Sequence, residues 1–232
     1  FYIYYGNGSA SETNDTDVWS GDYVMVQHMN EDPSGSAPQL INSKNNSENN
    51  GSSNGSMSSA DLVSAKLGNG INFDGTDDSA IIGSVADIPT GNSNVTISGW
   101  VKPNDLSGLK GMLAWGTCGG QRTEMGMVRN GSNFRQVYCA WSGSPIDLDG
   151  STTIASDSWH YLVTTWNGTN GEIFLNGTSD GTSGTGSLNV QAANYYIGRR
   201  PQGGAFFNGA LDELRISNSV RSADWIATEY NN

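Results

Sequence analysis

The stretch that decides the fold is GALDELRI at residues 209–216, followed by RSADWIATEY at residues 221–230. The first segment alternates in the manner of a β-strand, and the second has the apolar spacing of one short helix. A two-residue period places Asp212 on the same face as Leu214 and Ile216, so a carboxylate begins an otherwise buried row. We therefore expect a last strand followed by a closing helix, and an Asp212 that needs partners.

The closing helix is expected over residues 223–230. Ser222 is a suitable N-cap, because its side chain can accept a hydrogen bond from the first turn of the helix. Trp225 and Ile226 are expected to hold this helix against the rest of the protein. Upstream, turn dipeptides such as Asn-Gly separate many short apolar runs, which predicts strands near residues 21–28, 71–73, 79–82, 95–101, 112–115, 124–129, 134–141, 159–166, 172–175, 195–198 and 210–217. The strands at 159–166 and 172–175 are expected to form a hairpin through the turn at 167–171.

The composition agrees with an all-β protein. The 232 residues include 31 Gly and only 15% charged residues, which favours short strands and tight turns over helices. A chain of this length suits one large β-sandwich with its own apolar core.

Several segments resemble laminin-G-like jelly rolls of the concanavalin A-like lectin/glucanase superfamily. They are GINFDGTDD at 70–78, VTISGWVKP at 95–103, SWHYLV at 158–163 and the C-terminal stretch itself. The resemblance covers roughly residues 20–232. It implies a two-sheet antiparallel jelly-roll sandwich with one short C-terminal helix.

The domain organisation follows from this resemblance. Residues 1–20 are expected to be an N-terminal strand and hinge, because FYIYYGN is similar to the last strand of a small β-domain in secreted microbial proteins. Residues 21–232 form the sandwich, with a long polar surface loop at about 41–60. The first strand either pairs within its own sheet or completes the sheet of a neighbouring copy, and its residues are Phe1, Tyr2, Ile3, Tyr4 and Tyr5.

The charge of the chain excludes one class of partner. The net charge of −12 and only 11 Lys and Arg argue against nucleic acid, whose binding rests on clustered basic residues. An acidic surface is instead typical of a protein held soluble in a salty exterior, or of one that collects divalent cations. The sequence has no run of about 18 apolar residues, so no membrane span is expected.

The two cysteines, Cys118 and Cys139, flank segments expected to be adjacent strands. A structural disulfide is our preferred interpretation, and a pair of free thiols is the alternative. A disulfide indicates a secreted protein, extracellular or at the cell surface.

Catalytic motifs are missing from the sequence. Glucanases of the superfamily carry two catalytic glutamates in an E-x-D-x-E pattern, and no two of the seven Glu here lie two to four residues apart. Glu213 follows Asp212 directly, so the two are expected on opposite faces of the strand. His28 and His160 have no nucleophile motif to serve. We therefore predict that the protein is not an enzyme.

Calcium is the expected cofactor, because it prefers the carboxylate and amide oxygens that are abundant here. The resemblance implies a structural calcium at the rim of the sandwich, with Asp212 as the first candidate ligand. Glu31, Asp32 and Asp74 lie in acidic turns and are further candidates. The alternative is that such side chains accept backbone N–H bonds.

Aromatic side chains could serve as platforms for sugar rings, with amides and carboxylates beside them. Trp100 falls on the polar face of its strand. Trp141 lies next to the polar segment SGS at 142–144, and Phe206 and Phe207 come after the glycines at 203–204. The alternative for each is core packing under a loop.

The function expected from these features is non-enzymatic extracellular recognition, with a glycan or a surface polymer as partner. The alternative is a structural subunit of an extracellular filament or surface layer, which binds copies of itself through its N-terminal strand.

Overall fold

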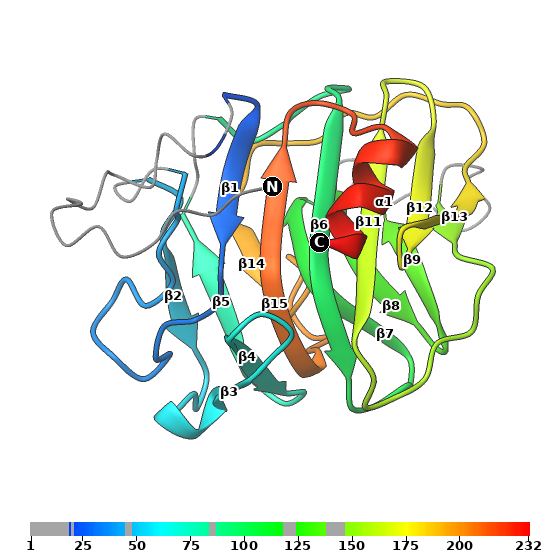
Figure 1. Ribbon diagram of the computed structural model, residues 1–232. Coiled ribbons are helices and arrows are strands. Elements are labelled where there is room, and N and C mark those ends of the chain that lie inside the picture. The colour runs from blue at the N-terminus through cyan, green and yellow to red at the C-terminus, as the bar shows by residue number, and fades with distance from the viewer. Residues whose placement is uncertain (1–18, 20, 45–47, 84–86, 118–123, 138–146) are drawn as a thin grey trace, which may run out of the picture.

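Two antiparallel β-sheets pack face to face, and one short helix lies on the outside of one of them (Figure 1). The computed structural model describes residue 19 and residues 21–44, 48–83, 87–117, 124–137 and 147–232. This architecture confirms the all-β two-sheet sandwich with one C-terminal helix. Within these ranges, no helix is long and apolar enough to cross a membrane.

The sheet beneath the helix is called the front sheet. Its strands, in spatial order, are β13 (Thr178–Thr182), β12 (Gly171–Leu175), β11 (His160–Trp166), β6 (Val95–Pro103), β15 (Asn208–Ser217), β4 (Asn69–Asp74) and β3 (Leu62–Ser64). A further strand, β1 (Tyr23–Gln27), pairs with the second half of β15, while β4 pairs with its first half. The expected β11–β12 hairpin is confirmed.

The other sheet is called the back sheet. Its strands, in spatial order, are β10 (Leu148–Asp149), β9 (Asn133–Val137), β8 (Glu124–Asn130), β7 (Leu109–Gly116), β14 (Tyr195–Ile197), β5 (Ser79–Ile82) and β2 (Gly51–Asn54). One continuous core fills the space between the sheets, because the alternating apolar residues of both sheets point inward. Its largest fully buried side chains include those of Trp115, Trp166, Tyr195, Phe73 and Phe134.

Strand β15 does not follow the simple alternation expected from its sequence. Its pairing with β6 shifts between Asp212 and Arg215, and Glu213 has a left-handed backbone with φ 53°. The shift is a β-bulge, in which one extra residue re-aims the side chains that follow. As a result Leu214 and Ile216 face the core, whereas Asp212 lies opposite Trp100 on the outer face. The predicted row of Asp212 with Leu214 and Ile216 is therefore wrong.

The same bulge overturns the prediction that Asp212 and Glu213 point to opposite faces. Glu213 Oε2 accepts from Arg215 Nη2 at 2.7 Å, and Arg215 also pairs with Glu229 of the helix outside the sheet. Both carboxylates therefore lie on the outer face.

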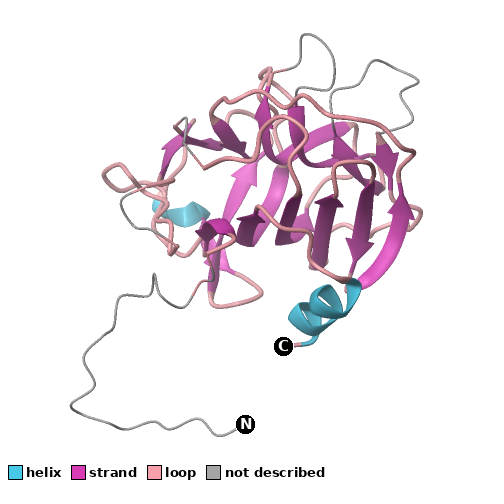
Figure 2. Cartoon of the chain, turned by 90° about the horizontal axis from the view of Figure 1, so that it is seen from above, coloured by secondary structure: helices cyan, strands magenta, loops and turns pink. Residues whose placement is uncertain are grey.

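The helix α1 (Ala223–Asn231) packs on the outside of the front sheet near the C-terminus (Figures 1 and 2). The Oγ atom of Ser222 accepts from the backbone N–H of Trp225 at 3.2 Å, which confirms the expected N-cap. Ile226 is fully buried, as expected, but Trp225 is 48% exposed. Adjacent helical residues point about 100° apart, so only one of the two can face the sheet.

The described parts of the polar segment at 41–60, residues 41–44 and 48–60, hold more regular structure than the loop we expected. It contributes β2, which pairs with β5, and a 3-10 turn, η2 (Ser59–Asp61). Its buried amides are hydrogen-bonded to the backbone: Asn42 Oδ1 accepts from Val26 N–H at 2.9 Å. Backbone and side-chain hydrogen bonds can therefore order a segment that has few apolar residues to bury.

Candidate functional site

Helix α1 covers part of the outer face of the front sheet. Trp100, Tyr161, Val163 and Phe174 form an apolar cluster there with Ile226 of the helix. The Trp100 ring centroid lies 5.1 Å from that of Tyr161, and the indole is only 7% exposed. Trp100 does lie on the face expected from its strand period, but it is a packing residue rather than an open platform for a sugar.

A chain of charged contacts ties α1 to the sheet. Arg215 contacts Glu229 of the helix through Nη1 and Glu213 of the bulge through Nη2. Tyr161 donates its hydroxyl to Glu229 Oε2 at 2.6 Å, and His28 Nδ1 lies 2.6 Å from Glu213 Oε1. The hydrogen bond to Glu213 raises the pKa of His28, although burial opposes it. This network holds α1 against the sheet and so fixes the position of the residues that the helix presents.

A groove of about 560 Å³ runs beside α1 and is called the α1 groove. Leu67 and Trp225 line it, and Arg215 and Glu229 also reach its surface. Both apolar residues are unusually open for their size, with exposed fractions of 54% for Leu67 and 48% for Trp225. Asp224, Thr228 and Asn232 add polar groups to the same lining. An aromatic ring with carboxylate, hydroxyl and amide groups around it suits a sugar, which has apolar C–H faces and polar hydroxyls.

The Trp225 indole is held in place by a cation–π stack. The guanidinium carbon of Arg221 lies 4.6 Å from the Trp225 ring centroid and 4.6 Å from that of Tyr23. Arg221 Nη1 is paired with Asp22 Oδ2 at 3.0 Å, so the guanidinium itself is anchored. Such a stack orients the ring before any ligand arrives, which lowers the entropy cost of binding.

A smaller pocket of about 290 Å³ lies at the back sheet and includes Tyr196 in its lining. The guanidinium carbon of Arg199 stands 4.2 Å from the Tyr196 ring centroid. The back sheet therefore also presents an aromatic ring stacked on an arginine. Tyr196 offers a matched comparison for Trp225.

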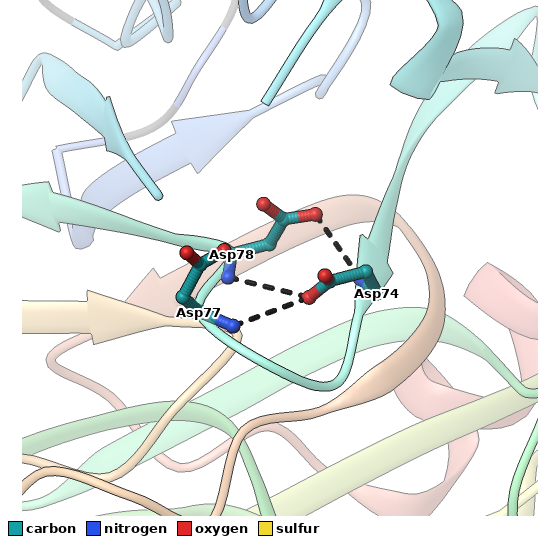
Figure 3. A group of neighbouring side chains, drawn as sticks. All are labelled: Asp74, Asp77 and Asp78. Carbon is teal, nitrogen blue, oxygen red and sulfur yellow. Dashed lines mark hydrogen bonds between the residues drawn. The ribbon is translucent and has the colours of Figure 1, made fainter. Parts of the chain in front are cut away.

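The turn after β4 brings three carboxylates together (Figure 3). Ligand oxygens of Asp74, Asp77 and Asp78 lie within 4.8 Å of one another, and no other described residues form such an acidic group of three. Asp74 Oδ1 accepts the backbone N–H groups of Thr76, Asp77 and Asp78, with the shortest N···O distance, 2.7 Å, to Thr76. Burial raises the pKa of Asp74, but these bonds outweigh it and lower the pKa.

The chemistry of this turn fits a cation. Asp78 is 2% exposed, and its Oδ1 atom has no hydrogen-bond partner among the described residues. Burial raises the pKa of Asp78. A divalent ion would satisfy the buried oxygen and keep the carboxylate charged, because calcium prefers several hard oxygen ligands.

The other predicted calcium ligands do not join this group. Asp212 is buried and accepts the backbone N–H of Leu67 at 2.8 Å, and burial raises its pKa to about 6. Glu31 lies 3.3 Å from the backbone N–H of Ile41, and Asp32 accepts from Ser34. The structure therefore does not bring the four predicted ligands together, and among the described residues only Asp74 of the four belongs to a cluster of three carboxylates.

The remaining predicted site residues divide into two groups. Phe207 is fully buried in the core, and Phe206 is half-buried, so Phe207 offers no open ring face. Outside the described residues lie Trp141, the cysteines Cys118 and Cys139, and the expected assembly strand of Phe1, Tyr2, Ile3, Tyr4 and Tyr5. The predictions for that second group stay predictions.

Comparisons with known proteins agree with this architecture. A family model described as "Concanavalin A-like lectin/glucanases superfamily" matches residues 74–227, about two thirds of the chain. The comparison with curated proteins gives no match.

Solved structures show the same fold at low sequence identity. Domain 4 of AbnA, an extracellular GH43 arabinanase from Geobacillus stearothermophilus solved with arabinotriose, has a TM-score of 0.65 at 16% identity, over 89% of this chain and 97% of that domain. The binding domain of Paraclostridial Mosquitocidal Protein 1 has a TM-score of 0.69 at 15% identity, over 94% of this chain. The binding domain of botulinum neurotoxin serotype D has a TM-score of 0.61 at 12% identity, again over 94% of this chain.

This chain spans only 52% and 51% of the two toxin domains. At such identities the likeness shows the fold alone. The family match over most of the chain, on the sandwich described above, shows that the protein belongs to the concanavalin A-like lectin/glucanase superfamily.

Proposed function

We propose that this protein is a non-enzymatic extracellular module that binds carbohydrate through the α1 groove. The single observation that carries the proposal is an exposed, arginine-stacked Trp225 beside a groove with polar groups around it. Domain 4 of the arabinanase, which shares this fold, was solved with arabinotriose, which supports the same class of ligand here.

The charges of the groove narrow the class of sugar. Arg215 is already engaged by Glu213 and Glu229, so its positive charge is neutralised by its own neighbours. Asp224 adds a further carboxylate to the lining. A sugar acid would meet net negative charge, so the groove favours neutral glycans.

The placement of the acidic residues on the outer face of the front sheet supports a non-enzymatic role. Asp212 and Glu213, which are adjacent on the outer face, are both engaged. Asp212 accepts the Leu67 N–H, and Glu213 contacts His28 and Arg215. Both are almost fully buried, at 0% and 7% exposure, whereas a glycosidase needs two carboxyl groups that flank the bond to be cleaved.

The test is an array of immobilised neutral plant and microbial oligosaccharides, arabinan fragments included, with the wild type, Trp225→Ala and Tyr196→Ala. We expect the wild type to bind a restricted set of glycans and Trp225→Ala to lose about fivefold or more in affinity, since stacking on an aromatic ring contributes about 1 kcal/mol or more. Tyr196→Ala should bind as the wild type does. Loss with Tyr196→Ala alone would place the site on the back sheet, and no binding to any glycan would reject the function.

We also propose that calcium steadies the turn after β4. Asp77→Asn keeps an acceptor for Ser56 N–H and Oγ while it removes one charge from the cluster. Addition of calcium should raise the melting temperature of the wild type and have less effect on this variant. The control is Asp32→Asn in the other acidic turn, which should respond as the wild type does. Equal responses of all three proteins, or no response, would contradict the proposal.

A further inference from the structure

A polar pocket of about 310 Å³ lies near the α1 groove, at the edge of the front sheet where β1 begins. It is called the Asn49 pocket and is lined by Tyr23, Lys44, Glu48, Asn49, Asp87 and Asn218. Neither the expected sites nor the family match gives it a role. Its lining combines two carboxylates, two amides and an ammonium group, in contrast to the apolar groove.

Asn49 is the unusual member of this lining. It is 7% exposed, and its backbone is left-handed with φ 58°. Its backbone carbonyl oxygen accepts from Gln27 Nε2 at 2.8 Å, and its side-chain Nδ2 donates to Val24 O at 3.0 Å. The bond from Nδ2 to Val24 O fixes the orientation of the side-chain amide, because only the NH₂ group can donate to a carbonyl.

The other side-chain atom, Asn49 Oδ1, has no hydrogen-bond partner in the described part of the chain. A buried acceptor without a donor is costly, and native proteins rarely keep one. A ligand that donates a hydrogen bond from within the pocket would remove this cost. The structure therefore offers an oriented acceptor that lacks only a donor.

The neighbouring groups indicate what kind of donor fits. Glu48 and Asp87 are exposed carboxylates and accept hydrogen bonds, whereas Lys44 can only donate; its Nζ already bonds Trp19 O at 3.0 Å. A hydroxyl group can both donate and accept, so a ring with several hydroxyls can satisfy all of these groups at once. The volume is sufficient for one sugar unit.

The Asn49 pocket and the α1 groove share one structural element. Arg221 lies between the Tyr23 ring, which lines the pocket, and the Trp225 ring, which lines the groove. The guanidinium group is therefore in contact with one wall of each site. This arrangement suits an oligosaccharide with one unit stacked on Trp225 in the groove and another hydrogen-bonded in the Asn49 pocket.

We propose that the Asn49 pocket is a second carbohydrate-binding site, which takes one hydroxyl-rich sugar unit by hydrogen bonds from its hydroxyls to Asn49 Oδ1 and the nearby carboxylates. The ligand class rests on the function proposed above, but the site is separate from the groove. Asn49→Gly removes the acceptor, and glycine adopts the left-handed backbone without strain. Asn218→Ala removes an exposed amide of the lining.

The experiment is a titration of ¹⁵N-labelled protein with neutral monosaccharides, arabinose, galactose, glucose and N-acetylglucosamine, followed by NMR. At least one sugar should shift the side-chain amide signals of Asn49 and Asn218 in a saturable manner. Asn49→Gly should weaken this binding about tenfold, as loss of an oriented hydrogen bond does, and Asn218→Ala should weaken it less. Asp157→Gly replaces another left-handed residue outside the lining, at φ 57°, and should bind as the wild type does.

The indole N–H signal of Trp225 separates the two claims. If sugars shift the Trp225 signal and leave Asn49 and Asn218 unmoved, the pocket is rejected while the proposed function stands. Unchanged affinity in both Asn49→Gly and Asn218→Ala would also reject the pocket. If no sugar shifts any of these signals and the array shows no binding, both the function and the pocket are rejected.

Discussion

The outer face of the front sheet has a covered region and an open region, and aromatic residues have different roles in the two. In the covered region, α1 lies over Trp100 and Tyr161, which are almost fully buried. In the open region, Trp225 and Tyr23 stack on Arg221 beside solvent-accessible space. Aromatic rings thus stabilise the fold on one side of the helix and line the candidate binding sites on the other.

The comparison teaches that burial, rather than residue type, separates the roles. Among the covered rings, Tyr161 has its hydroxyl satisfied internally by a hydrogen bond to Glu229. The open rings are held rigid by a cation that leaves room for a ligand. Substitutions in the covered region should therefore change stability, and those in the open region should change binding.

Trp100→Ala is expected to have the largest effect. Removal of this buried ring should lower the free energy of unfolding by about 3–5 kcal/mol, the usual cost of a large cavity in a core. Trp225→Ala, which removes a ring that is half exposed, should change it by less than about 1 kcal/mol. Urea unfolding of both variants measures this, and comparable losses would break the distinction between the two regions.

The free energy of unfolding should depend on pH in a way that reports the titration of Asp212, which is buried in the covered region. Its pKa is raised from 3.8 to about 6 in the folded protein, because burial disfavours the charge. Below the pKa of this group in the unfolded state, the raised pKa makes its full contribution to the free energy of unfolding. This contribution, about 1–3 kcal/mol, is lost as pH rises through about 6. The pKa of His28 is also raised, so its contribution to the free energy of unfolding is likewise lost as pH rises above 6.5.

Asp212→Asn keeps an oxygen for Leu67 N–H and removes the titration. We expect the stability of the variant to fall less than that of the wild type between about pH 4 and about pH 8. Urea unfolding at several pH values within this window checks the prediction. If the free energy of unfolding falls equally with pH in both proteins, ionisation of Asp212 does not destabilise the folded state, which would contradict the effect expected from its burial.

Tyr161→Phe tests the polar link between the cluster and α1. The variant loses one hydrogen bond to a charged group, while Glu229 keeps its contact with Arg215, so we expect a loss of about 1.5 kcal/mol. Glycan binding should be retained, since the hydroxyl faces the helix and not the groove. A stable variant with weakened binding would move Tyr161 from the covered to the open region.

Ser222→Ala tests the boundary between the regions, because Ser222 caps α1 and also lines the groove. Loss of the cap should cost about 1 kcal/mol, the usual value for such substitutions. Ser222→Asp supplies another capping side chain and should restore stability. If alanine and aspartate behave alike in thermal unfolding, the cap does not position the helix.

Much of the fold could be predicted from the sequence because local signals agreed with tertiary packing. The capped helix and the β11–β12 hairpin follow from short-range patterns and appear as expected. The bulge at Glu213 could not be predicted, since its left-handed backbone has no glycine to mark it and its carboxylate is held by His28, far away in the chain. One extra residue placed Asp212 and Glu213 together on the outer face, while Leu214 and Ile216 face the core.

The candidate site was harder to predict for a related reason. The period of β6 placed Trp100 correctly outside the core, but the sequence does not show which part of that face a helix covers. The signal for Trp225 was present, because two adjacent helical residues cannot both face one sheet. Asn49 was hidden in a stretch of Asn, Ser and Gly, where nothing local distinguishes a buried amide from an exposed one.

The central claim is that the open region binds carbohydrate at Trp225. Its most direct test is a crystal structure of the protein with the oligosaccharide that binds best on the array. Our account predicts a sugar ring packed against the Trp225 indole in the α1 groove. An oligosaccharide bound elsewhere, at Tyr196 of the back sheet for example, with the groove empty, would contradict it.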